Sequence, residues 1–245
     1  MKVYGLQTAI VYFLSILIVF TSCKYDVILP PLPCMSAPID LVSWWPGDED
    51  AKDVVSDNDG TLQNGTTLVP GIVGQAFSFD GVDDFVDATT NNLPTGNSDR
   101  TLEMWVKINS FVANEAFFAG YGTFGSGNQT YHLGTTQSGN LFFSSWGPAI
   151  FGPELNTGVW YHVAVTNVND LVTLYLDGKS VTNGTQNINI NTPSSTQFFV
   201  GRISGSFGDS RRLNGFVDEV SIYNRALSDS EIQAIFNADI RGKCG

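Results

Sequence analysis

The chain has 245 residues, of which 42% are hydrophobic and 15% charged, a composition typical of a globular protein and unlike a disordered or coiled-coil chain. Its 24 Asp and Glu residues outnumber 12 Lys and Arg residues, for a net charge of -12. No basic cluster is present to follow a phosphate backbone, which argues against a nucleic-acid partner. The acidic balance is compatible with neutral ligands or bound cations.

The N-terminus is typical of an export signal. An apolar run over residues 9–20 is too short to cross a bilayer as a helix. The small residues just before Cys23 resemble a lipobox, in which the cysteine becomes the lipidated first residue of the mature protein, although Phe20 departs from the usual aliphatic residue. We expect a lipoprotein-type signal peptide over residues 1–22 and a lipid anchor on Cys23 at the outer surface of a bacterial cell envelope. Ordinary secretion is the alternative.

Residues 23–35 follow as a tether, because three prolines in this stretch prevent it from continuing a helix or a central strand. With Cys23 as the lipid acceptor, Cys34 and Cys244 remain, and an exported compartment permits them to form a disulfide. Such a bridge requires the two ends of the domain over residues 36–245 to meet in space. Two free thiols are the alternative.

Beyond the tether, short apolar or alternating runs recur between turn signals, which predicts an all-β domain. The expected strands are Leu41 to Trp45, Ala76 to Phe79, Phe85 to Ala88, Leu102 to Ile108, Ala116 to Tyr121, Leu141 to Trp146, Trp160 to Thr166, Leu171 to Leu176, Gln197 to Arg202 and Phe216 to Tyr223. Asp177-Gly178 predicts a tight type I′ hairpin within a meander over residues 160–181. The capping box from Ser228 to Glu231 predicts one short helix near the C-terminus.

Six segments resemble, in order, the bacterial laminin G-like jelly-roll family. They are LVSWWPGD (41–48), GQAFSFDGVDDFV (74–86), LEMWVK (102–107), WYHVAVT (160–166), LYLDGK (174–179) and GFVDEVSIYNRALS (215–228). The resemblance runs from about Ile39 to Asn237. It implies an antiparallel jelly-roll sandwich of two curved sheets with the first and last strands adjacent, in the concanavalin A-like lectin and glucanase superfamily.

Acidic residues near both ends of the domain are candidates for a structural Ca²⁺ site. Strand alternation places Asp218 on a face with apolar residues, where a carboxylate needs a partner or a metal. Asp48 and Asp53 belong to an acidic loop, and Ca²⁺ prefers such oxygen ligands. The resemblance implies a cation between the first and last strands, and we therefore expect Asp48, Asp53 and Asp218 to bind Ca²⁺. The alternative is a solvated loop and an Asp218 that accepts backbone N–H groups. The weaker candidates, expected to form a turn, are Asp80, Asp83 and Asp84.

Catalytic patterns are missing from the sequence. The glucanases of the superfamily carry Glu-x-Asp-x-x-Glu on one strand, and this motif is not found here. Glu103 has no acidic neighbour two residues away, so we expect it to be a surface residue. His132 and His162 lack catalytic or zinc spacing, and His162 is expected to be a hydrogen-bonded core residue. No nucleotide site is expected, because the Gly-rich segment 125–128 does not join a strand to a helix. Carboxylates from different strands remain free to pair.

A glycan-binding surface needs exposed aromatic rings beside polar side chains, because sugars present apolar ring faces and hydroxyl groups together. The candidates are Tyr121, Tyr131, Trp146, Arg202 and Arg211, with Phe124 and Arg212 as further members. Each aromatic has a core position as its alternative. The sequence therefore favours a non-catalytic recognition module for a glycan or a surface protein. A structural or adhesive envelope protein without a small ligand, and a glycan-active hydrolase or lyase, are the alternatives.

Overall fold

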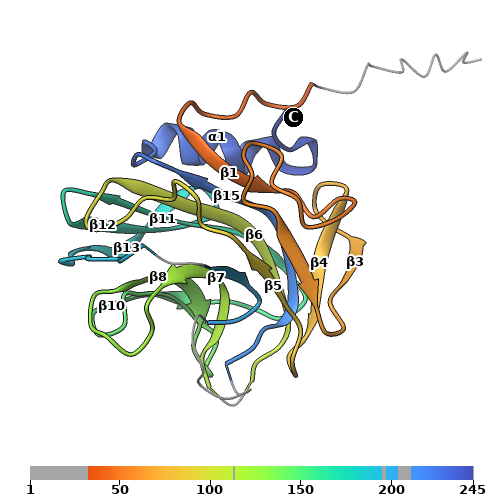
Figure 1. Ribbon diagram of the computed structural model, residues 1–245, viewed down its shortest axis with the longest axis horizontal. Helices are drawn as coiled ribbons and strands as arrows, with labels where there is room; N and C mark the ends of the chain where they lie inside the picture. Colours follow the sequence, from red (N-terminus) through yellow and green to blue (C-terminus); the bar gives the residue numbers. More distant parts are fainter. Residues whose placement is uncertain (1–32, 113, 195–196, 204–210, 245) are drawn as a thin grey trace, which may run out of the picture. The chain divides into compact units, whose positions relative to one another are not determined.

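The computed structural model describes residues 33–112, 114–194, 197–203 and 211–244. The expected signal peptide, the proposed lipid acceptor Cys23 and the tether up to residue 32 lie outside the described residues. Two antiparallel sheets face each other, and one short helix covers the outer side of one sheet (Figure 1). In the described part of the chain, no helix combines the length and the apolar character that a membrane crossing requires.

The larger sheet has eight strands. Across the sheet they are β13 (Lys179–Asn187), β12 (Leu171–Leu176), β11 (Trp160–Val168), β6 (Arg100–Ser110), β15 (Asn214–Tyr223), β4 (Gln75–Asp80) and β3 (Thr67–Pro70), and β1 (Leu41–Trp45) pairs with β15 outside this path. The first strand therefore lies beside the last one, as the resemblance implied.

The smaller sheet has seven strands. In order they are β10 (Ala149–Glu154), β9 (Asn140–Ser144), β8 (Thr130–Thr135), β7 (Ala116–Gly122), β14 (Phe198–Val200), β5 (Phe85–Ala88) and β2 (Gly60–Gln63). Every pair of neighbouring strands in the two sheets is antiparallel. The prediction of an all-β, two-sheet jelly-roll sandwich is confirmed.

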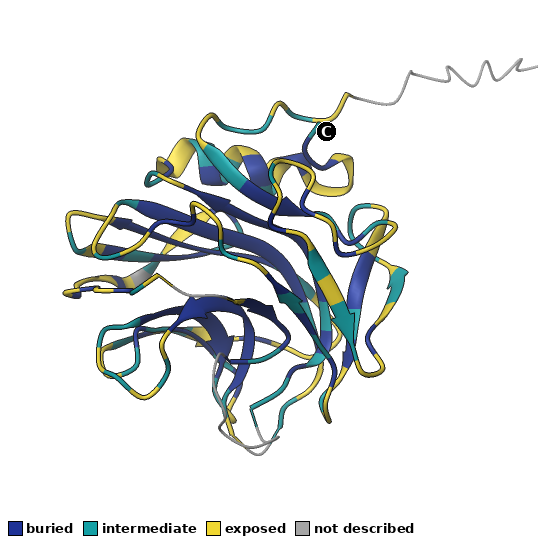
Figure 2. Cartoon of the chain, in the orientation of Figure 1, coloured by how far each residue is buried: buried dark blue, intermediate teal, exposed yellow. Residues whose placement is uncertain are grey.

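The main core draws its side chains from both sheets, and Figure 2 shows strands of both sheets coloured as buried. In β6, Leu102, Met104, Val106 and Ile108 follow the period of two and are all fully buried in this core. Aromatic packing joins the sheets, since the rings of Trp45 and Phe198 stack with centroids 4.6 Å apart. Burying a large apolar side chain contributes about 1.5–3 kcal/mol to the stability of the fold. The alternation of apolar residues along each strand therefore largely determines which face of the strand lies in this core.

The hairpin turns have the backbone that their residues predict. Asp177 and Gly178 connect β12 to β13 with φ angles of 49° and 76°, and Asn169 and Asp170 connect β11 to β12 with φ angles of 49° and 66°. Positive φ at both central residues is the mark of the type I′ turn. The predicted meander is confirmed and extends through β13 to residue 187.

The two ends of the domain are joined. Cys34 and Cys244 form a disulfide with a Cα–Cα distance of 5.1 Å, which confirms the predicted bridge. Beside it, the Met35 N–H donates to the Gly242 carbonyl (3.0 Å), and the Cys244 N–H donates to the Met35 carbonyl (2.8 Å). The ends of the described chain are therefore fixed by one covalent bond and a short parallel bridge.

The expected helix is α1 (Asp229–Ala238), and a short 3₁₀ helix, η1 (Asp239–Arg241), follows it. The capping box is formed, because the Ser228 hydroxyl accepts from the Glu231 N–H and the Glu231 carboxylate accepts from the Ser228 N–H. The buried face of α1 carries Ile232 and Ile235. These side chains pack on the outer face of the larger sheet against Tyr223, so the helix adds a third layer there.

Candidate functional site

A groove with aromatic walls lies on the outer face of the smaller sheet. Leu141 and Phe143 of β9 point into the main core, so Phe142 between them points outward. Phe142 and Phe151 line the groove together with Ser144, Trp146 and Glu115, around a volume of about 460 Å³. Phe151 is 59% exposed, which is unusual for a large aromatic side chain. We call this surface the aromatic groove.

Trp146 is held in a conformation that bulky residues seldom adopt. Its φ is 62°, and its N–H donates to the Ser144 hydroxyl at 3.1 Å in the turn between β9 and β10. Such positions persist only where the surrounding structure fixes them, and they cluster at binding sites. The Trp146 ring also contacts Phe124, with centroids 3.6 Å apart. The turn therefore presents an aromatic ring at a fixed place on the rim of the groove.

An ion pair borders the aromatic rings. The guanidinium of Arg211 lies 5.6 Å from the ring centroid of Phe124 and 5.4 Å from that of Trp146. Its Nε is 3.5 Å from Glu115 Oε2, and both side chains remain partly exposed. A cation over an aromatic face is a favourable arrangement that also restricts the arginine. The groove therefore combines apolar ring faces with a fixed donor and a fixed acceptor.

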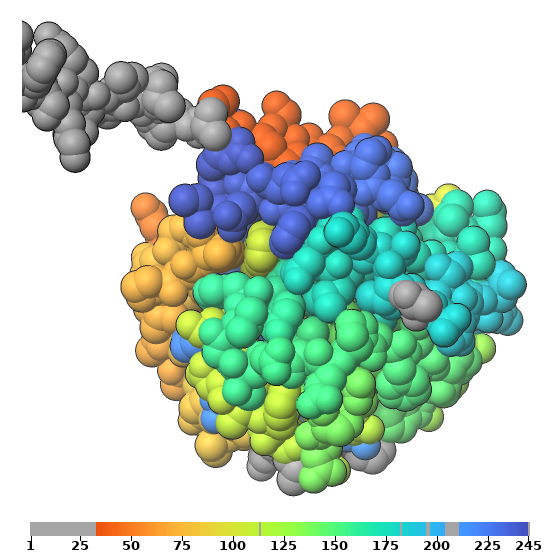
Figure 3. Space-filling model, turned by 180° about the vertical axis from the view of Figure 1, so that it is seen from behind, coloured from red at the N-terminus to blue at the C-terminus, as the bar shows by residue number. Residues whose placement is uncertain are grey.

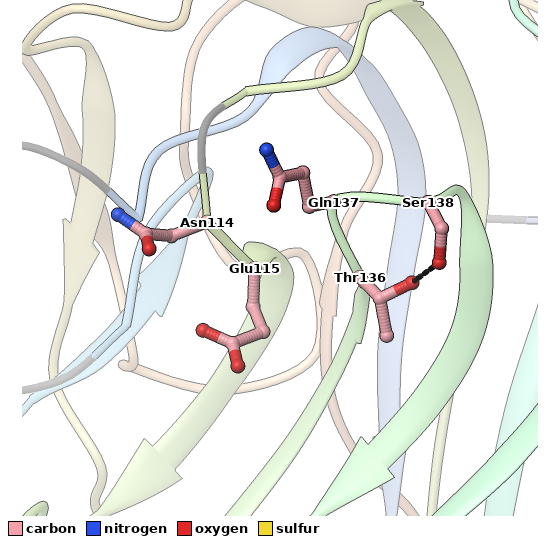
Figure 4. A pocket seen from close by; sticks show the side chains of 5 residues that line it. All are labelled: Asn114, Glu115, Thr136, Gln137 and Ser138. Atoms are coloured by element: carbon pink, nitrogen blue, oxygen red, sulfur yellow. Dashed lines mark hydrogen bonds between the residues drawn. The ribbon is translucent and has the colours of Figure 1, made fainter.

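A second, polar pocket of about 480 Å³ continues from Glu115. Figure 4 shows Asn114 and Glu115 on one side of it and Thr136, Gln137 and Ser138 on the other. Only one hydrogen bond joins the side chains drawn there, between the hydroxyls of Thr136 and Ser138 at 3.1 Å. Glu115 lines both spaces, so the polar pocket adjoins the aromatic groove at this residue.

The structure brings some of the expected ligand-binding residues together and excludes others. Trp146 and Arg211, with Phe124, meet at the groove. Tyr121 and Tyr131 are core residues, which corrects their assignment as ligand platforms, because their rings fill space between the sheets. The Tyr121 hydroxyl donates to the Pro94 carbonyl, and the Tyr131 hydroxyl donates to the Val165 carbonyl.

Arg202 lies elsewhere on the same sheet. Its guanidinium is 4.6 Å from the ring centroids of both Phe85 and Phe199, on β5 and β14. Arg212 also approaches Phe85, at 5.3 Å. These arginines therefore cover a second group of aromatic rings and do not line the aromatic groove.

Two of the three expected cation ligands, Asp218 and Asp48, accept hydrogen bonds from the turn between β3 and β4. Asp218 is fully buried, and its Oδ2 accepts from the N–H groups of Ile72 (2.8 Å) and Val73 (3.0 Å) between β3 and β4. Asp48 Oδ1 accepts from the Gln75 N–H at 2.8 Å at the end of the same turn. Burial, together with the negative charges of Glu219 and Asp48, raises the pKa of Asp218 to about 8, although the two backbone hydrogen bonds act to lower it. Asp218 Oδ1 has no hydrogen-bond partner.

Asp53 belongs to a different part of the structure. Its Oδ1 accepts from the N–H groups of Trp44 and Val55, each at 2.9 Å, and its Oδ2 accepts from the Ser56 hydroxyl at 2.6 Å. The carboxylate thus fixes the loop after β1. These contacts connect Asp53 to its own loop, whereas Asp48 and Asp218 are connected to the turn between β3 and β4.

Asp80, Asp83 and Asp84, the weaker candidates for a cation site, have carboxylate oxygens that lie close to one another. Within the described ranges, Asp80, Asp83 and Asp84 are the group of three whose candidate ligand atoms all lie within 4.8 Å of one another. Asp84 accepts from the Gly65 N–H (2.7 Å) and from the Asp80 N–H (3.0 Å). These bonds hold a turn, as the Asp-Gly and Asp-Asp pairs predicted.

Glu103 is not a surface residue, which corrects the expectation from its lone position on a strand. It is fully buried on the outer face of β6, beneath the C-terminal segment. Lys243 Nζ lies 3.1 Å from Glu103 Oε1 and 3.0 Å from Glu219 Oε2, and His162 Nε2 lies 3.1 Å from Glu103 Oε2. His162 is buried and hydrogen-bonded, as predicted. We call these four side chains the buried charge cluster.

The charged groups of this cluster shift the pKa values of one another. Burial acts to raise the pKa of Glu103, but Lys243 and His162 outweigh it and hold that pKa below the usual value. Burial raises the pKa of Glu219, and the two glutamates keep the pKa of Lys243 above its usual value despite burial. Carboxylates from two strands do pair here, but they are sealed from solvent and bound to an ammonium group. The cluster has the character of a structural clamp on the C-terminus.

Comparisons with known proteins agree with this architecture. The family model described as concanavalin A-like lectin/glucanases superfamily, Laminin_G_3, matches residues 80–233. This is more than half of the chain, and the chain belongs to this family. No curated protein sequence matches it significantly.

Solved structures of low sequence identity share the fold. Domain 4 of AbnA, an extracellular GH43 arabinanase from Geobacillus stearothermophilus in complex with arabinotriose, has a TM-score of 0.63 at 20% identity, over 80% of this chain and 97% of that one. Trypanosoma rangeli sialidase in complex with 2,3-difluorosialic acid has a TM-score of 0.67 at 21% identity, over 84% of this chain and 34% of that one. The binding domain of Paraclostridial Mosquitocidal Protein 1 has a TM-score of 0.64 at 20% identity, over 81% and 52%. This chain thus spans about a third of the sialidase.

Proposed function

We propose that this protein is a non-catalytic carbohydrate-recognition module of the bacterial cell envelope, and that it binds glycans in the aromatic groove. One observation carries the proposal: the exposed ring of Phe151 and the partly exposed ring of Trp146 line a groove whose rim bears the Glu115–Arg211 ion pair. A pyranose ring presents an apolar face that packs on an aromatic side chain. Its hydroxyl groups are both donors and acceptors, and they pair with a carboxylate and a guanidinium.

The groove has the composition of a small-molecule site. Such sites are concave and mostly apolar, with a few placed polar groups that fix orientation. Phe142, Trp146 and Phe151 supply the apolar part, and Ser144 and Glu115 supply polar groups at the edges. The adjoining polar pocket offers further hydroxyl and amide groups for a second sugar unit. The groove therefore suits an oligosaccharide better than a single sugar.

The structural neighbours support the same ligand class. The arabinanase domain is in complex with arabinotriose, and the sialidase is in complex with a sialic acid derivative. At this low sequence identity the neighbours support only the fold, so the proposal that the ligand is a glycan rests on the groove itself. Catalysis is not part of the proposal, because the carboxylates of the buried charge cluster are inaccessible to a substrate.

We also propose a structural Ca²⁺ ion at Asp218 and Asp48. The fit rests on the buried Oδ1 of Asp218, which has no hydrogen-bond partner and is available to coordinate a cation. The cation would offset the repulsion between the two carboxylates and stabilise the turn between β3 and β4. For placement in the cell, we propose the lipid anchor on Cys23 at the outer surface, with secretion as the alternative.

A glycan array probed with and without Ca²⁺ tests the binding function. We expect selective binding to a set of oligosaccharides. Phe151→Ala should weaken it about tenfold, because a ring contributing about 1.4 kcal/mol is lost from the groove. Ile240→Ala is the matched control, since Ile240 is 70% exposed and does not line the groove. Absence of glycan binding under all conditions would favour the structural or adhesive alternative, and release of reducing sugar would favour a hydrolase.

A further inference from the structure

A second pocket with aromatic walls lies on the opposite side of the domain, on the outer face of the larger sheet. It has a volume of about 420 Å³ and lies beside the C-terminal end of α1. Figure 3 shows this side, with α1 in blue above the orange β3–β4 segment and the green to teal strands β11 and β12. Its lining residues come from five separate segments: Ile72, Trp105, Trp160, Asp177, Phe236, Asn237 and Asp239. Nothing in the proposed function uses this pocket.

The strands place two tryptophans at its base. Trp105 lies opposite His162 in the register of β6 and β11, and Trp160 lies opposite Lys107. Residues two apart share a face, so both indoles are on the outer face of the sheet. The ring of Phe236 on α1 stacks on Trp105, with centroids 5.7 Å apart and planes 28° apart. The pocket is therefore bordered by three aromatic rings from three elements.

The β12–β13 turn brings a carboxylate to these rings. Gly178 packs so closely on α1 that an added Cβ would lie 3.0 Å from the Phe236 Cβ and 2.8 Å from the Gln233 Nε2. Glycine at this turn therefore lets the hairpin approach the helix and places Asp177 at the pocket. Asp177 Oδ1 accepts from the His162 N–H at 3.0 Å, which fixes the side chain. Burial raises the pKa of this carboxyl.

The charged side chains that line the pocket are both acidic, Asp177 and Asp239. Two basic side chains nearby make other contacts. Lys107 Nζ lies 5.9 Å from the Trp160 ring centroid and 5.3 Å from that of Phe216. Arg241 donates to the carbonyls of Asn237 and Ala238 at the end of α1. An organic cation between the two carboxylates and the rings would be stabilised by both, and the net charge of -12 favours its approach.

We propose that this pocket is a second binding site, specific for an amino sugar that carries a free ammonium group. The sugar ring packs on Trp160 and Phe236, and its ammonium group lies between Asp177 and Asp239. The amide of Asn237 and the remaining carboxylate oxygens pair with ring hydroxyls. A neutral sugar of the same shape leaves two carboxylates at the rings without a cation, so the pocket discriminates by charge.

A pair of oligosaccharides that differ only in charge tests this site. A glucosamine tetramer and its fully N-acetylated counterpart are titrated into the protein by calorimetry at about pH 6, where the amines are protonated. We expect the glucosamine tetramer to bind at least about tenfold more tightly, with an affinity that falls as salt is added. Equal affinity for the two tetramers, or no binding of the charged one, would overturn the proposal.

Variants locate the binding. Asp239→Asn removes a negative charge from the pocket, and asparagine tolerates the φ of 50° at this position. Trp160→Ala removes an aromatic ring from the pocket. Each substitution should weaken binding of the glucosamine tetramer by about fivefold or more. Asp50→Asn is the matched control, because Asp50 is exposed and lies in the loop after β1. Trp146→Ala changes the aromatic groove alone. If only Trp146→Ala loses binding of the glucosamine tetramer, the second site is overturned and the proposed function stays intact.

Discussion

Replacing Lys243 by Met should strongly destabilise the protein. The ammonium group lies 3.1 Å from Glu103 and 3.0 Å from Glu219, and all three side chains are almost completely buried. Removing one partner of a buried ion pair leaves a charge without compensation, which costs about 3–5 kcal/mol. Methionine keeps most of the length of the stem, so the loss reports charge more than volume. A loss of this size is a large fraction of the roughly 5–15 kcal/mol that stabilises a typical domain.

Urea unfolding at about pH 7 and about pH 5 measures this effect. In the native protein Lys243 helps keep the pKa of Glu103 low, so that carboxylate stabilises the fold above the pKa of the unfolded chain and loses its contribution as pH falls. Without the lysine, burial dominates and raises the folded pKa of both glutamates. The folded variant then binds more protons than the unfolded chain and regains stability at lower pH. Lys52→Met is the control, since Lys52 forms an exposed pair with Asp50. If both variants unfold alike at both pH values, the argument fails.

Three further outcomes are expected. Without Ca²⁺, the pKa of Asp218 is about 8 against an ordinary value of 3.8, so the stability of the fold falls as pH rises between these two values. Asp218→Asn should flatten this pH dependence. EDTA should lower the melting temperature of the native protein and leave that of Asp218→Asn unchanged; an unchanged melting temperature of the native protein would count against the cation. Cys34→Ser opens a loop with a sequence separation of 210 residues and should cost up to about 5 kcal/mol in a denaturant titration, whereas an unchanged midpoint contradicts this. Cys23→Ala should move the protein from the membrane fraction to the soluble fraction, and continued membrane association would exclude the lipid anchor.

Strands with strong alternation were predictable from the sequence, and most of those with glycine or proline were not, β7 with Gly120 being an exception. The bounds of β1, β5 and β12 agree with the expected runs. β8 was missed because Tyr131 and Leu133 face the core while His132 packs against Phe117 on the outer side, so both faces are buried and no polar alternation remains. The other strands without a prediction are β2, β3, β10 and most of β13. They are short or irregular, and β10 contains Gly152 and Pro153.

The candidate sites depend on which face of a sheet another segment covers, and a period of two does not reveal this. Glu103 has the pattern of an exposed residue, yet the C-terminal segment lies over it with Lys243. Phe142 lies between a leucine and a phenylalanine that both face the core, and its alternation would have placed it on the outer face. Tyr121 failed as a ligand platform because its hydroxyl finds partners inside the core, where the sequence offers no sign of them.

The bond between Cys34 and Cys244 turns the described domain into a covalent ring. A protease that cuts one exposed turn, such as the one between β8 and β9, opens this ring without producing two separate pieces. The fragments stay linked through the bridge, and the strands on either side of the cut remain paired with their neighbours. Release of a fragment requires a second cut or reduction of the disulfide, which gives the domain a tolerance of single nicks that its fold alone would not provide.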